Sequence, residues 1–400
     1  MKYAILVADG MADYPLKELD GRTPIEAART ENIDGITKEG QLGSAGMIPT
    51  GFAPGSDVAT LSILGYDPRA YYAGRAPLEA AKLGIELGSE EIAFRCNLIT
   101  VSDSLIADYS GGHIGDKEAA ELILFLGQHL ETPSVRFYPG VSYRHICVFK
   151  NSDLLQLNCT PPHDVLGEPA EEHMPQGREA RLLIELMERS YELLSSHPIN
   201  KSRVQNGLNP ANMIWLWGQG STPRMPSFRE RFGVGGGIIS AVDLLKGIAK
   251  LVGLDPIEVP GATGYYDTNY KGKADYALKC LERDDFVLVH VEAPDEAGHN
   301  AEMEEKIKAI ENFDRFIVGP VKERLSKRPD FRILVLPDHA TPLKLRTHTA
   351  DPVPFAWCGQ GILADEFEIF SEREAAKSSL SFRDGYQLID RFINSQKVVK

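Results

Sequence analysis

The chain begins with a short apolar run that ends in an acid and a glycine, Tyr3-Ala-Ile-Leu-Val-Ala-Asp9-Gly10. Three further runs are equally short, continuous and apolar, namely Met213–Trp217, Phe286–Val291 and Ile333–Leu336. Such runs are typical of parallel strands whose sheet is covered by helices on both faces. The sequence therefore predicts an α/β fold built on a mostly parallel sheet.

Segments of helical period alternate with these predicted strands. They are Lys117–His129, Glu179–Ser195, Ala241–Val252, Glu302–Leu325 and Gly385–Asn394. This alternation strengthens the α/β interpretation. In sheets of this kind, functional residues gather beyond the carboxyl ends of the strands. Asp9, Asp295, Asp338 and His339 all occupy such a position.

The middle of the chain has a different pattern, because its apolar runs are shorter and mixed in polarity. They are Ile92–Val101, Ser134–Tyr138 and His145–Phe149, and a stretch rich in Pro, His and acids follows them at 160–177. A chain of 400 residues exceeds the usual size of one hydrophobic core. We therefore expect a core domain formed by residues 1–85 and 207–400 and an inserted domain at 86–206. Asn206–Pro210 would be the linker that returns to the core.

The bulk composition excludes several classes of protein. A hydrophobic fraction of 43% and a charged fraction of 25% are ordinary for a soluble globular protein. The net charge of −14 argues against nucleic acid or an anionic membrane as a partner. No apolar run is long enough for a signal peptide or a membrane span, so we expect a cytoplasmic protein. The five cysteines form no C-x-x-C pair, which favours reduced thiols over disulfides or a cysteine zinc site.

Residues with metal-ligand chemistry lie at both ends of the chain. They are Asp9, Ser56, Asp295, His299, Asp338, His339 and His348. Asp295 and His299 are four residues apart and would share one face of a helix, although Pro294 and Gly298 favour a looser turn. Each histidine alone could equally be a hydrogen-bonded core residue. Together, carboxylates and imidazoles suit a Mn²⁺ or Zn²⁺ ion, and the absence of thiolates argues against a structural zinc site.

Ser56 lies in a turn rich in Pro and Gly, before the apolar helical segment Val58–Leu64. Serine at such a place is commonly a helix N-cap. The same place favours an anion, so a phosphate on Ser56 would be stabilised there. Two metal ions beside an activated serine are suited to phosphoryl transfer.

Motifs that hold these residues run through almost the whole chain. They are Val7-Ala-Asp-Gly10, Pro54-Gly-Ser-Asp-Val-Ala59, Leu64-Gly-Tyr-Asp-Pro68, Gly74-Arg-Ala-Pro-Leu-Glu-Ala80, Ala93-Phe-Arg-Cys-Asn-Leu98, Val291-Glu-Ala-Pro-Asp-Glu-Ala-Gly-His299, Leu336-Pro-Asp-His339 and Arg346-Thr-His-Thr-Ala-Asp-Pro352. On these motifs the chain resembles the 2,3-bisphosphoglycerate-independent phosphoglycerate mutases of the short, archaeal-type branch, within the alkaline phosphatase superfamily.

The resemblance implies an alkaline-phosphatase-like core and a smaller inserted α/β domain that binds substrate or acts as a lid. It implies two divalent ions, with Mn²⁺ ahead of Zn²⁺, Mg²⁺ and Co²⁺. The ligands carried over by motif are Asp295, His299 and His348 for one ion and Asp9, Ser56, Asp338 and His339 for the other. Ser56 would be the nucleophile that carries the phosphate as 3-phosphoglycerate and 2-phosphoglycerate interconvert.

The substrate, a small phosphorylated hydroxy acid, needs cationic contacts. By resemblance, Arg95 and His113 belong to the substrate face of the inserted domain, and Lys271 reaches the phosphate on the serine. Arg75 and Arg144 are further candidates, because arginine grips phosphate and carboxylate well. For each of these arginines an ordinary ion pair is the alternative.

The exact substrate stays open on the sequence alone, because several relatives carry Arg where this chain has His113. A homoserine-kinase-like phosphotransferase, a metal-dependent phosphatase and a non-catalytic metal-binding protein are the alternatives. Gly233–Gly237 fits neither nucleotide-binding glycine motif and is predicted to be a strand-to-helix turn. The sequence does not decide the oligomeric state.

Overall fold

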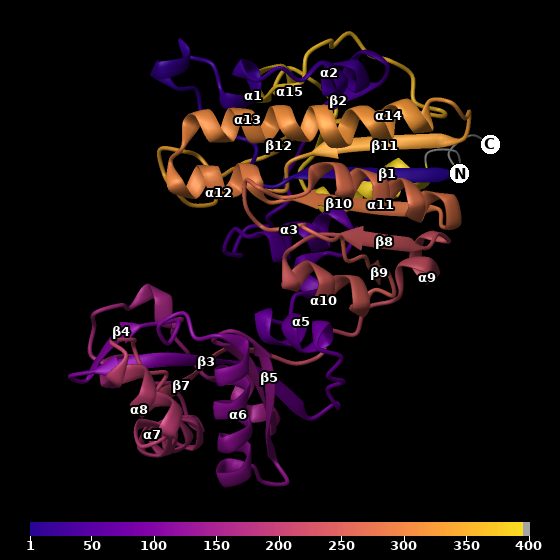
Figure 1. Cartoon of the computed structure of the whole chain (residues 1–400). Coiled ribbons are helices and arrows are strands. Elements are labelled where there is room, and N and C mark those ends of the chain that lie inside the picture. The colour runs from indigo at the N-terminus through magenta and orange to yellow at the C-terminus, as the bar shows by residue number, and fades with distance from the viewer. Residues whose placement is uncertain (395–400) are drawn as a thin grey trace. The chain divides into compact units, whose positions relative to one another are not determined.

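The computed structural model describes residues 1–394 and divides into two compact units (Figure 1). The first unit consists of Met1–Tyr72 together with the chain from Met225 onward, and the second of Ala73–Arg224. Both boundaries lie outside the expected 86 and 206. The reason is that helix α5 (Arg75–Lys82) packs on the second unit's sheet and strand β7 (Met213–Gly220) pairs within it. Asn206–Pro210 is thus a loop inside the second unit and not a linker between units.

The first unit is built on an eight-stranded sheet with the order β13-β2-β12-β11-β1-β10-β8-β9. The strands are β1 (Lys2–Ala8), β2 (Gln41–Ala45), β8 (Gly236–Ile239), β9 (Asp255–Pro256), β10 (Phe286–Val291), β11 (Phe331–Leu336), β12 (Val353–Gly359) and β13 (Ser381–Phe382). The strands from β11 to β9 run parallel, and only β12 is antiparallel to its neighbours. The predicted α/β fold with a mostly parallel sheet is confirmed.

The central strands β1, β10 and β11 end in register, so the residues that follow each strand lie close together. Ala8 of β1 lies beside Val291 of β10, and Val7 lies beside Leu336 of β11. The Asp9 N–H continues the ladder by donating to the Val291 carbonyl over 2.9 Å. The residues that follow these strands therefore emerge at the same edge of the sheet.

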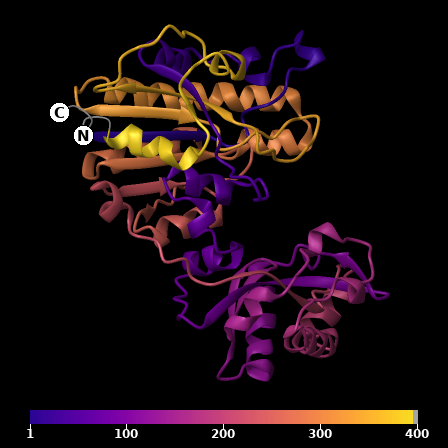
Figure 2. The ribbon, with the colours of Figure 1, turned by 180° about the vertical axis from the view of Figure 1, so that it is seen from behind.

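Helices cover both faces of this sheet. Helices α11 (Tyr270–Arg283), α13 (Met303–Phe313) and α14 (Gly319–Leu325) lie on one face (Figure 1). The C-terminal helix α16 (Leu388–Asn394) lies on the other (Figure 2), where Phe392 packs against Tyr3 with ring centroids 5.8 Å apart.

The remaining helical segments of the first unit connect these layers. They are η1 (Lys17–Leu19), α1 (Pro24–Ala27), α2 (Glu31–Lys38), α3 (Ser56–Ile63), α4 (Pro68–Tyr71), α9 (Phe228–Phe232), α10 (Asp243–Leu251), α12 (Ala293–Asn300), α15 (Glu372–Ala375) and η6 (Gly385–Gln387). None of the helices in the described part of the chain is long and apolar enough to cross a bilayer.

The predicted continuous helix Glu302–Leu325 is interrupted. The π-helical segment η5 (Asp314–Val318) separates α13 from α14. Gly319 and Pro320 follow at once, and proline cannot donate the N–H that regular α-helical pairing needs. The apolar period therefore located the helix correctly, while the break depends on Pro320.

The second unit contains a five-stranded antiparallel sheet. Its strands follow the order β4-β3-β6-β5, and β7 pairs with β3. The elements are β3 (Glu91–Ser102), β4 (Leu105–Asp108), α6 (Asp116–Leu130), β5 (Val135–Val141), β6 (Arg144–Lys150), η2 (Ser152–Gln156), η3 (Pro162–Asp164), η4 (Ala170–His173), α7 (Ala180–Ser195) and α8 (Pro198–Gln205). The run Met213–Trp217 was expected in the parallel sheet, but it lies in β7, antiparallel to β3.

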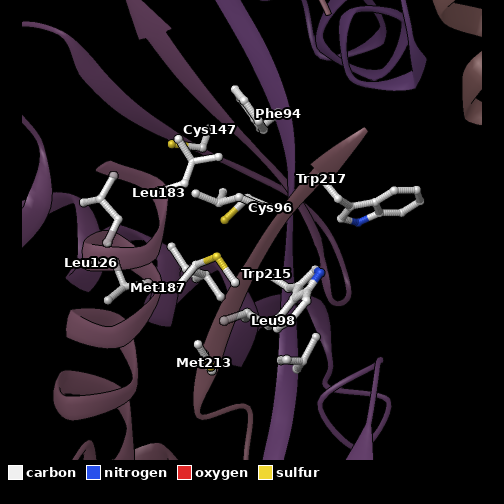
Figure 3. Packing of buried hydrophobic residues seen from close by; sticks show 14 of the residues in the cluster. Phe94, Cys96, Leu98, Leu126, Cys147, Leu183, Met187, Met213, Trp215 and Trp217 are labelled. Carbon is white, nitrogen blue, oxygen red and sulfur yellow. The ribbon is translucent and has the colours of Figure 1, made fainter. Parts of the chain in front are cut away.

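The core of the second unit is apolar and contains several sulfur atoms (Figure 3). Helices α6 and α7 pack on the sheet through Leu126, Leu183 and Met187, which pack in one cluster with Cys96 of β3 and Trp215 of β7. All five side chains are at most 1% exposed. All five cysteines of the chain are free, as expected.

The glycine run at 233–237 leads into a strand, so the predicted strand-to-helix turn is wrong. Gly233 ends α9 with a left-handed φ of 75°, and Gly236 begins β8. A Cβ at Gly236 would lie 1.7 Å from the Phe286 carbonyl oxygen of the neighbouring β10. Glycine is needed here because two strands approach closely.

Candidate functional site

Two clusters of carboxylate and imidazole groups lie in the first unit. One consists of Asp295, His299 and His348, and we call it cluster one. The other, cluster two, consists of Asp9, Asp338 and His339. Within each cluster, one ligand atom per residue can be chosen so that all lie within 4.8 Å of one another. The structure thus brings together six residues that the sequence placed in distant motifs.

Gly10 allows the two clusters to adjoin at the end of β1. It has a left-handed φ of 59°. A Cβ at this position would lie 2.4 Å from Thr341 Oγ1 and 2.5 Å from Asp295 Oδ1. A side chain is therefore excluded directly after Asp9, because Asp295 occupies the space it would need.

Asp295 and His299 lie on one face of α12, a regular helix and not the looser turn that Pro294 suggested. Pro294 stands in the first turn, where its missing N–H would have no intrahelical partner anyway. The four-residue spacing brings His299 Nε2 to 3.2 Å from Asp295 Oδ2. His348 Nε2 approaches the other carboxylate oxygen at 3.4 Å.

The histidines of cluster one are oriented by backbone carbonyls. His299 Nδ1 donates to the Arg346 carbonyl (3.0 Å), and His348 Nδ1 donates to the Pro54 carbonyl (3.2 Å). Both Nε2 atoms then carry lone pairs, and they lie 2.9 Å apart. Such an arrangement needs a cation or a shared proton between the rings. A carbonyl on Nδ1 and a free Nε2 are also the usual environment of a metal-binding histidine.

Cluster two is almost completely enclosed. The side chain of Asp9 is 4% exposed, and those of Asp338 and His339 are 0% exposed. Asp338 Oδ1 accepts from the N–H groups of Gly10 (3.1 Å) and His339 (2.9 Å). Asp338 Oδ2 is buried and has no hydrogen-bond partner among the described residues.

Burial makes the negative charges of cluster two costly, which favours a cation beside them. Burial raises the pKa of Asp9 well above its ordinary value, and the neighbouring carboxylates of Asp338 and Asp295 raise it further. Burial also lowers the pKa of His339. A neutral imidazole, two carboxylates and an unpartnered oxygen fit a divalent metal ion that prefers oxygen and nitrogen ligands.

Ser56 is the first residue of α3 and lies against cluster two. Its Oγ is 3.2 Å from His339 Nε2 and 3.4 Å from both carboxylate oxygens of Asp9. The rings of His339 and His348 have centroids 4.2 Å apart, so cluster one is adjacent. A partly exposed hydroxyl thus stands next to two neighbouring sets of metal-ligand atoms.

Sequence reasoning missed His290, although a histidine within an otherwise apolar buried strand was a readable signal. Its ring lies behind cluster two, with Nε2 at 3.5 Å from Asp9 Oδ2 and at 3.7 Å from Asp338 Oδ2. Burial alone would lower the pKa of His290, but Asp338 and Glu292 outweigh it and raise the pKa to about 9. Lys273, two residues after the predicted Lys271, is buried and contacts Glu292 at 2.6 Å.

Three of the predicted substrate residues gather in the second unit. Arg95 of β3 is buried, pairs with Glu79 at 3.0 Å and stacks over Trp217 at 4.3 Å. Burial lowers the pKa of Arg95, and the nearby charges of Arg75 and Arg144 lower it further, while Glu79 opposes the shift. These arginines together form a positive group.

His113 and Lys271 are not part of this group of arginines. His113 is exposed in the turn after β4, with a left-handed φ of 49°. Lys271 is exposed in the first turn of α11, in the first unit. His113 makes no described contact with the arginines of its own unit, and Lys271 makes none with the two metal-ligand clusters of its own unit.

Comparisons with known proteins identify relatives along the whole chain. A family model described as 2,3-bisphosphoglycerate-independent phosphoglycerate mutase matches residues 37–200. A protein of that name from Methanothrix thermoacetophila is 52% identical over 390 residues, which cover 97% of this chain and 98% of the relative.

Two solved structures also align with the whole chain. A protein from Pyrococcus horikoshii is 30% identical with a TM-score of 0.84, covering 100% of this chain and 98% of the other. A structure titled cofactor-independent phosphoglycerate mutase, from Thermoplasma acidophilum, is 30% identical with a TM-score of 0.69, covering 99% and 100%. This chain belongs to the family of the 2,3-bisphosphoglycerate-independent phosphoglycerate mutases.

Proposed function

We propose that this protein interconverts 3-phosphoglycerate and 2-phosphoglycerate through a phosphoserine at Ser56, without 2,3-bisphosphoglycerate. The observation that carries the proposal is the position of the Ser56 hydroxyl, 3.2 Å from His339 Nε2 and 3.4 Å from the Asp9 carboxylate. The substrate follows from the activity that gives the family its name.

Two divalent ions fit the donors on this chain, with Mn²⁺ preferred over Zn²⁺, Mg²⁺ and Co²⁺. Cluster one would hold one ion, and cluster two together with Ser56 would hold the other. Such ions, when bound, supply positive charge that lowers the pKa of a serine hydroxyl and neutralises a phosphoryl group in transfer.

The chain's own groups account for the two transfers. Ser56 Oγ loses its proton and forms a bond to phosphorus, while the bond between phosphorus and the 3-oxygen of glycerate breaks. The proton that Ser56 Oγ gives up is balanced by the one that the departing 3-oxygen takes up, so His339 and Asp9 stay free to ligate an ion. The 2-hydroxyl of the retained glycerate then attacks the phosphoserine, and the bond between Ser56 Oγ and phosphorus breaks. The 2-hydroxyl loses a proton in this step, and Ser56 Oγ takes one up to become a hydroxyl again. Ser56 stands in the first turn of α3, where backbone N–H groups favour a phosphate.

The second unit would be the domain that binds substrate and excludes water. Arg95, Arg75 and Arg144 form a positive group suited to a phosphate or a carboxylate. His113 and Lys271 are retained as substrate contacts on the family resemblance. A cytoplasmic location and the role of this unit as a lid are predictions from the sequence.

The decisive experiment incubates the purified protein with Mn²⁺ and 3-phosphoglycerate in the absence of 2,3-bisphosphoglycerate. We expect 2-phosphoglycerate to form. Release of inorganic phosphate instead would identify a phosphatase, and ATP-dependent phosphorylation of homoserine without mutase activity would identify a kinase.

A pair of serine variants tests the nucleophile. Ser56→Ala should abolish transfer with the fold intact. Ser62→Ala is the matched control, because Ser62 lies on the same helix with its Oγ donating to the Met47 carbonyl over 2.6 Å. It should remain active. A folded Ser56→Ala protein with normal activity would refute the role of Ser56.

A further inference from the structure

We infer that His290, Glu292 and Lys273 form a buried polar relay that positions the carboxylates of Asp9 and Asp338 and thereby sets the metal affinity of cluster two. The three side chains are positioning residues, because they act through the carboxylates and do not touch the reacting oxygen of Ser56. The inference rests on the proposed metal binding at cluster two.

His290 faces the two carboxylates directly. It lies on β10, is 1% exposed, and places Nε2 at 3.5 Å from Asp9 Oδ2 and at 3.7 Å from Asp338 Oδ2. Among the described residues, His290 Nε2 and Asp338 Oδ2 are both buried without a hydrogen-bond partner. Buried polar groups are normally hydrogen-bonded. Because these two atoms face each other, we expect His290 Nε2 to carry a proton and to direct its N–H at the carboxylates.

The opposite side of the His290 ring is fixed by Glu292. His290 Nδ1 lies 3.4 Å from Glu292 Oε1. The same carboxylate accepts from Ser240 Oγ (2.9 Å) and from the Ala241 N–H (2.7 Å). Lys273 Nζ donates to Glu292 Oε2 over 2.6 Å and to the His290 carbonyl over 2.8 Å. Each polar group of the relay therefore has one defined orientation.

The energetic cost of the relay argues for a role beyond folding. Lys273 is 0% exposed and Glu292 3%, and a buried ion pair of this kind stabilises a fold no better than apolar residues of the same volume. What an apolar replacement could not supply is an N–H aimed at the metal-facing carboxylates. Partners of this type usually tune a metal site, and their loss typically weakens metal affinity about 10- to 100-fold.

A second buried lysine in the same unit serves as the internal control. Lys306 is also 0% exposed and pairs with Asp13 at 2.8 Å. Its other acceptors are the backbone carbonyls of Ala12 and Thr341. Lys306 thus matches Lys273 in burial and pairing. Its partner Asp13, however, makes no described contact with His290 or with a ligand side chain of cluster two, whereas Glu292 contacts the His290 ring.

The test titrates Co²⁺ alone into a His299→Ala/His348→Ala background, in which cluster two is the remaining candidate site. Cobalt absorption and equilibrium dialysis give the affinity, and thermal melting checks the fold. His290→Leu should weaken cobalt binding about 10- to 100-fold and change the absorption spectrum. His290→Gln should restore most of the affinity, because its amide places an N–H where Nε2 was.

Two double variants complete the design. Lys273→Met/Glu292→Gln removes the charges of the lysine and the glutamate and should also weaken cobalt binding. If His290→Leu does not fold, this double variant is the test of the inference. Lys306→Met/Asp13→Asn is the control and should leave cobalt affinity unchanged.

The inference would be overturned if His290→Leu and Lys273→Met/Glu292→Gln both bound cobalt as tightly as the His299→Ala/His348→Ala protein does. The proposed function would remain intact. An equal loss in the Lys306 control would make the effect merely structural and would also overturn the inference. If the background itself binds no cobalt, the proposed metal binding fails, and the inference that rests on it fails as well.

Discussion

Both units of this molecule bury apolar side chains, but the first unit encloses more charged ones. The first unit encloses Lys273, Lys306 and Asp338 at 0% exposure beneath its parallel sheet edge. The second unit fills its core with leucine, methionine, cysteine and tryptophan (Figure 3). It buries Arg95 as well, but with the apolar support of the Trp217 ring. The difference is large because burying a charge costs several kcal/mol, whereas burying an apolar side chain is favourable.

The contrast indicates where function resides. Several enclosed charges of the first unit gather at cluster two, where His290 contacts Asp9 and Lys273 pairs with Glu292. Others, such as Arg332 and Asp314, bind backbone groups elsewhere in the unit. Buried charge is retained when a site needs it, and perturbed pKa values cluster at such places. Ordinary packing can therefore stabilise the second unit, while the grouped carboxylates and imidazoles of the first are suited to divalent cations.

Metal removal should produce the largest difference between the units. Chelation is expected to abolish mutase activity and to destabilise the first unit by about 3 to 4 kcal/mol, the effect of metal at 100 to 1,000 times its Kd. A Trp357→Phe variant makes tryptophan fluorescence report on Trp215 and Trp217 in the second unit, and that transition should not move. Equal shifts in both units would break the comparison.

Removing the charge of one buried lysine should have an effect on stability of similar size, without the complete loss of activity expected on chelation. Lys306→Met leaves Asp13 as an unpaired buried charge and should cost about 3 to 5 kcal/mol in the free energy of unfolding of the first unit. Lys306→Met/Asp13→Asn removes both charges and should recover most of that loss. Denaturant melts followed by the fluorescence of Trp357 would measure it, and a neutral single variant would contradict the expected cost.

In the second unit, truncation of an apolar side chain should matter as much as charge does in the first. Leu126→Ala on α6 removes a side chain that is 0% exposed and should cost about 3 kcal/mol. Leu124→Ala is the matched control, because Leu124 lies on the same helix and is 58% exposed. Fluorescence of Trp215 and Trp217 in denaturant gives both values. Similar costs for the two leucines would mean that packing does not dominate this unit.

The smallest effect expected is an opposite response of the two units to pH. Burial raises the pKa of Glu372, in the first unit, to about 7 from an ordinary 4.5. The folded state then holds the proton more tightly, so stability is greatest below pH 4.5 and falls as the pH rises toward 7. Burial lowers the pKa of His145, in the second unit, from 6.5 to about 3. There the stability is complete above pH 6.5 and falls as the pH drops.

The free energy of unfolding should change by about 2 kcal/mol over the first 1.5 pH units above 4.5 for Glu372, and over the first 1.5 pH units below 6.5 for His145. Unfolding free energies between about pH 5 and 7, followed separately by Trp357 and by the two tryptophans of the second unit, check the signs. Glu372→Gln should flatten the slope of the first unit alone, and His145→Gln that of the second alone. A slope of the same sign in both units would contradict the assignment.

Local patterns predicted the elements better than their placement. The run Phe286–Val291 and the helical period at Lys117–His129 agree with β10 and α6 to within a few residues. Met213–Trp217 is also a strand, but it belongs to the antiparallel sheet, because apolar runs do not specify which strand they pair with. The units divide at 72/73 and 224/225 and not at 86 and 206 for the same reason, since α5 and β7 join the second unit through tertiary contacts with β3 and its neighbours.

Some residues of the candidate site could be predicted from the sequence, and others only from tertiary contacts. Asp9, Ser56 and Asp338 could be chosen from the sequence, because each follows or precedes a recognisable element and matches a family motif. His290 and Lys273 could not be assigned a role, since the sequence gives their type but not the side chains that face them. Lys271, predicted as a substrate contact, lies on the exposed side of the same helix.

The sequence by itself determined which residues can ligate a metal, where strands and helices form, and the family to which the chain belongs, because these follow from residue type, period and motif. Only the tertiary structure decided that the carboxylates of Asp9 and Asp338 face the Nε2 of His290, which has no hydrogen-bond partner among the described residues, and that a lysine and a glutamate stand behind that ring. Contacts between residues hundreds of positions apart depend on strand order and register, and neither is written in any local stretch of the chain.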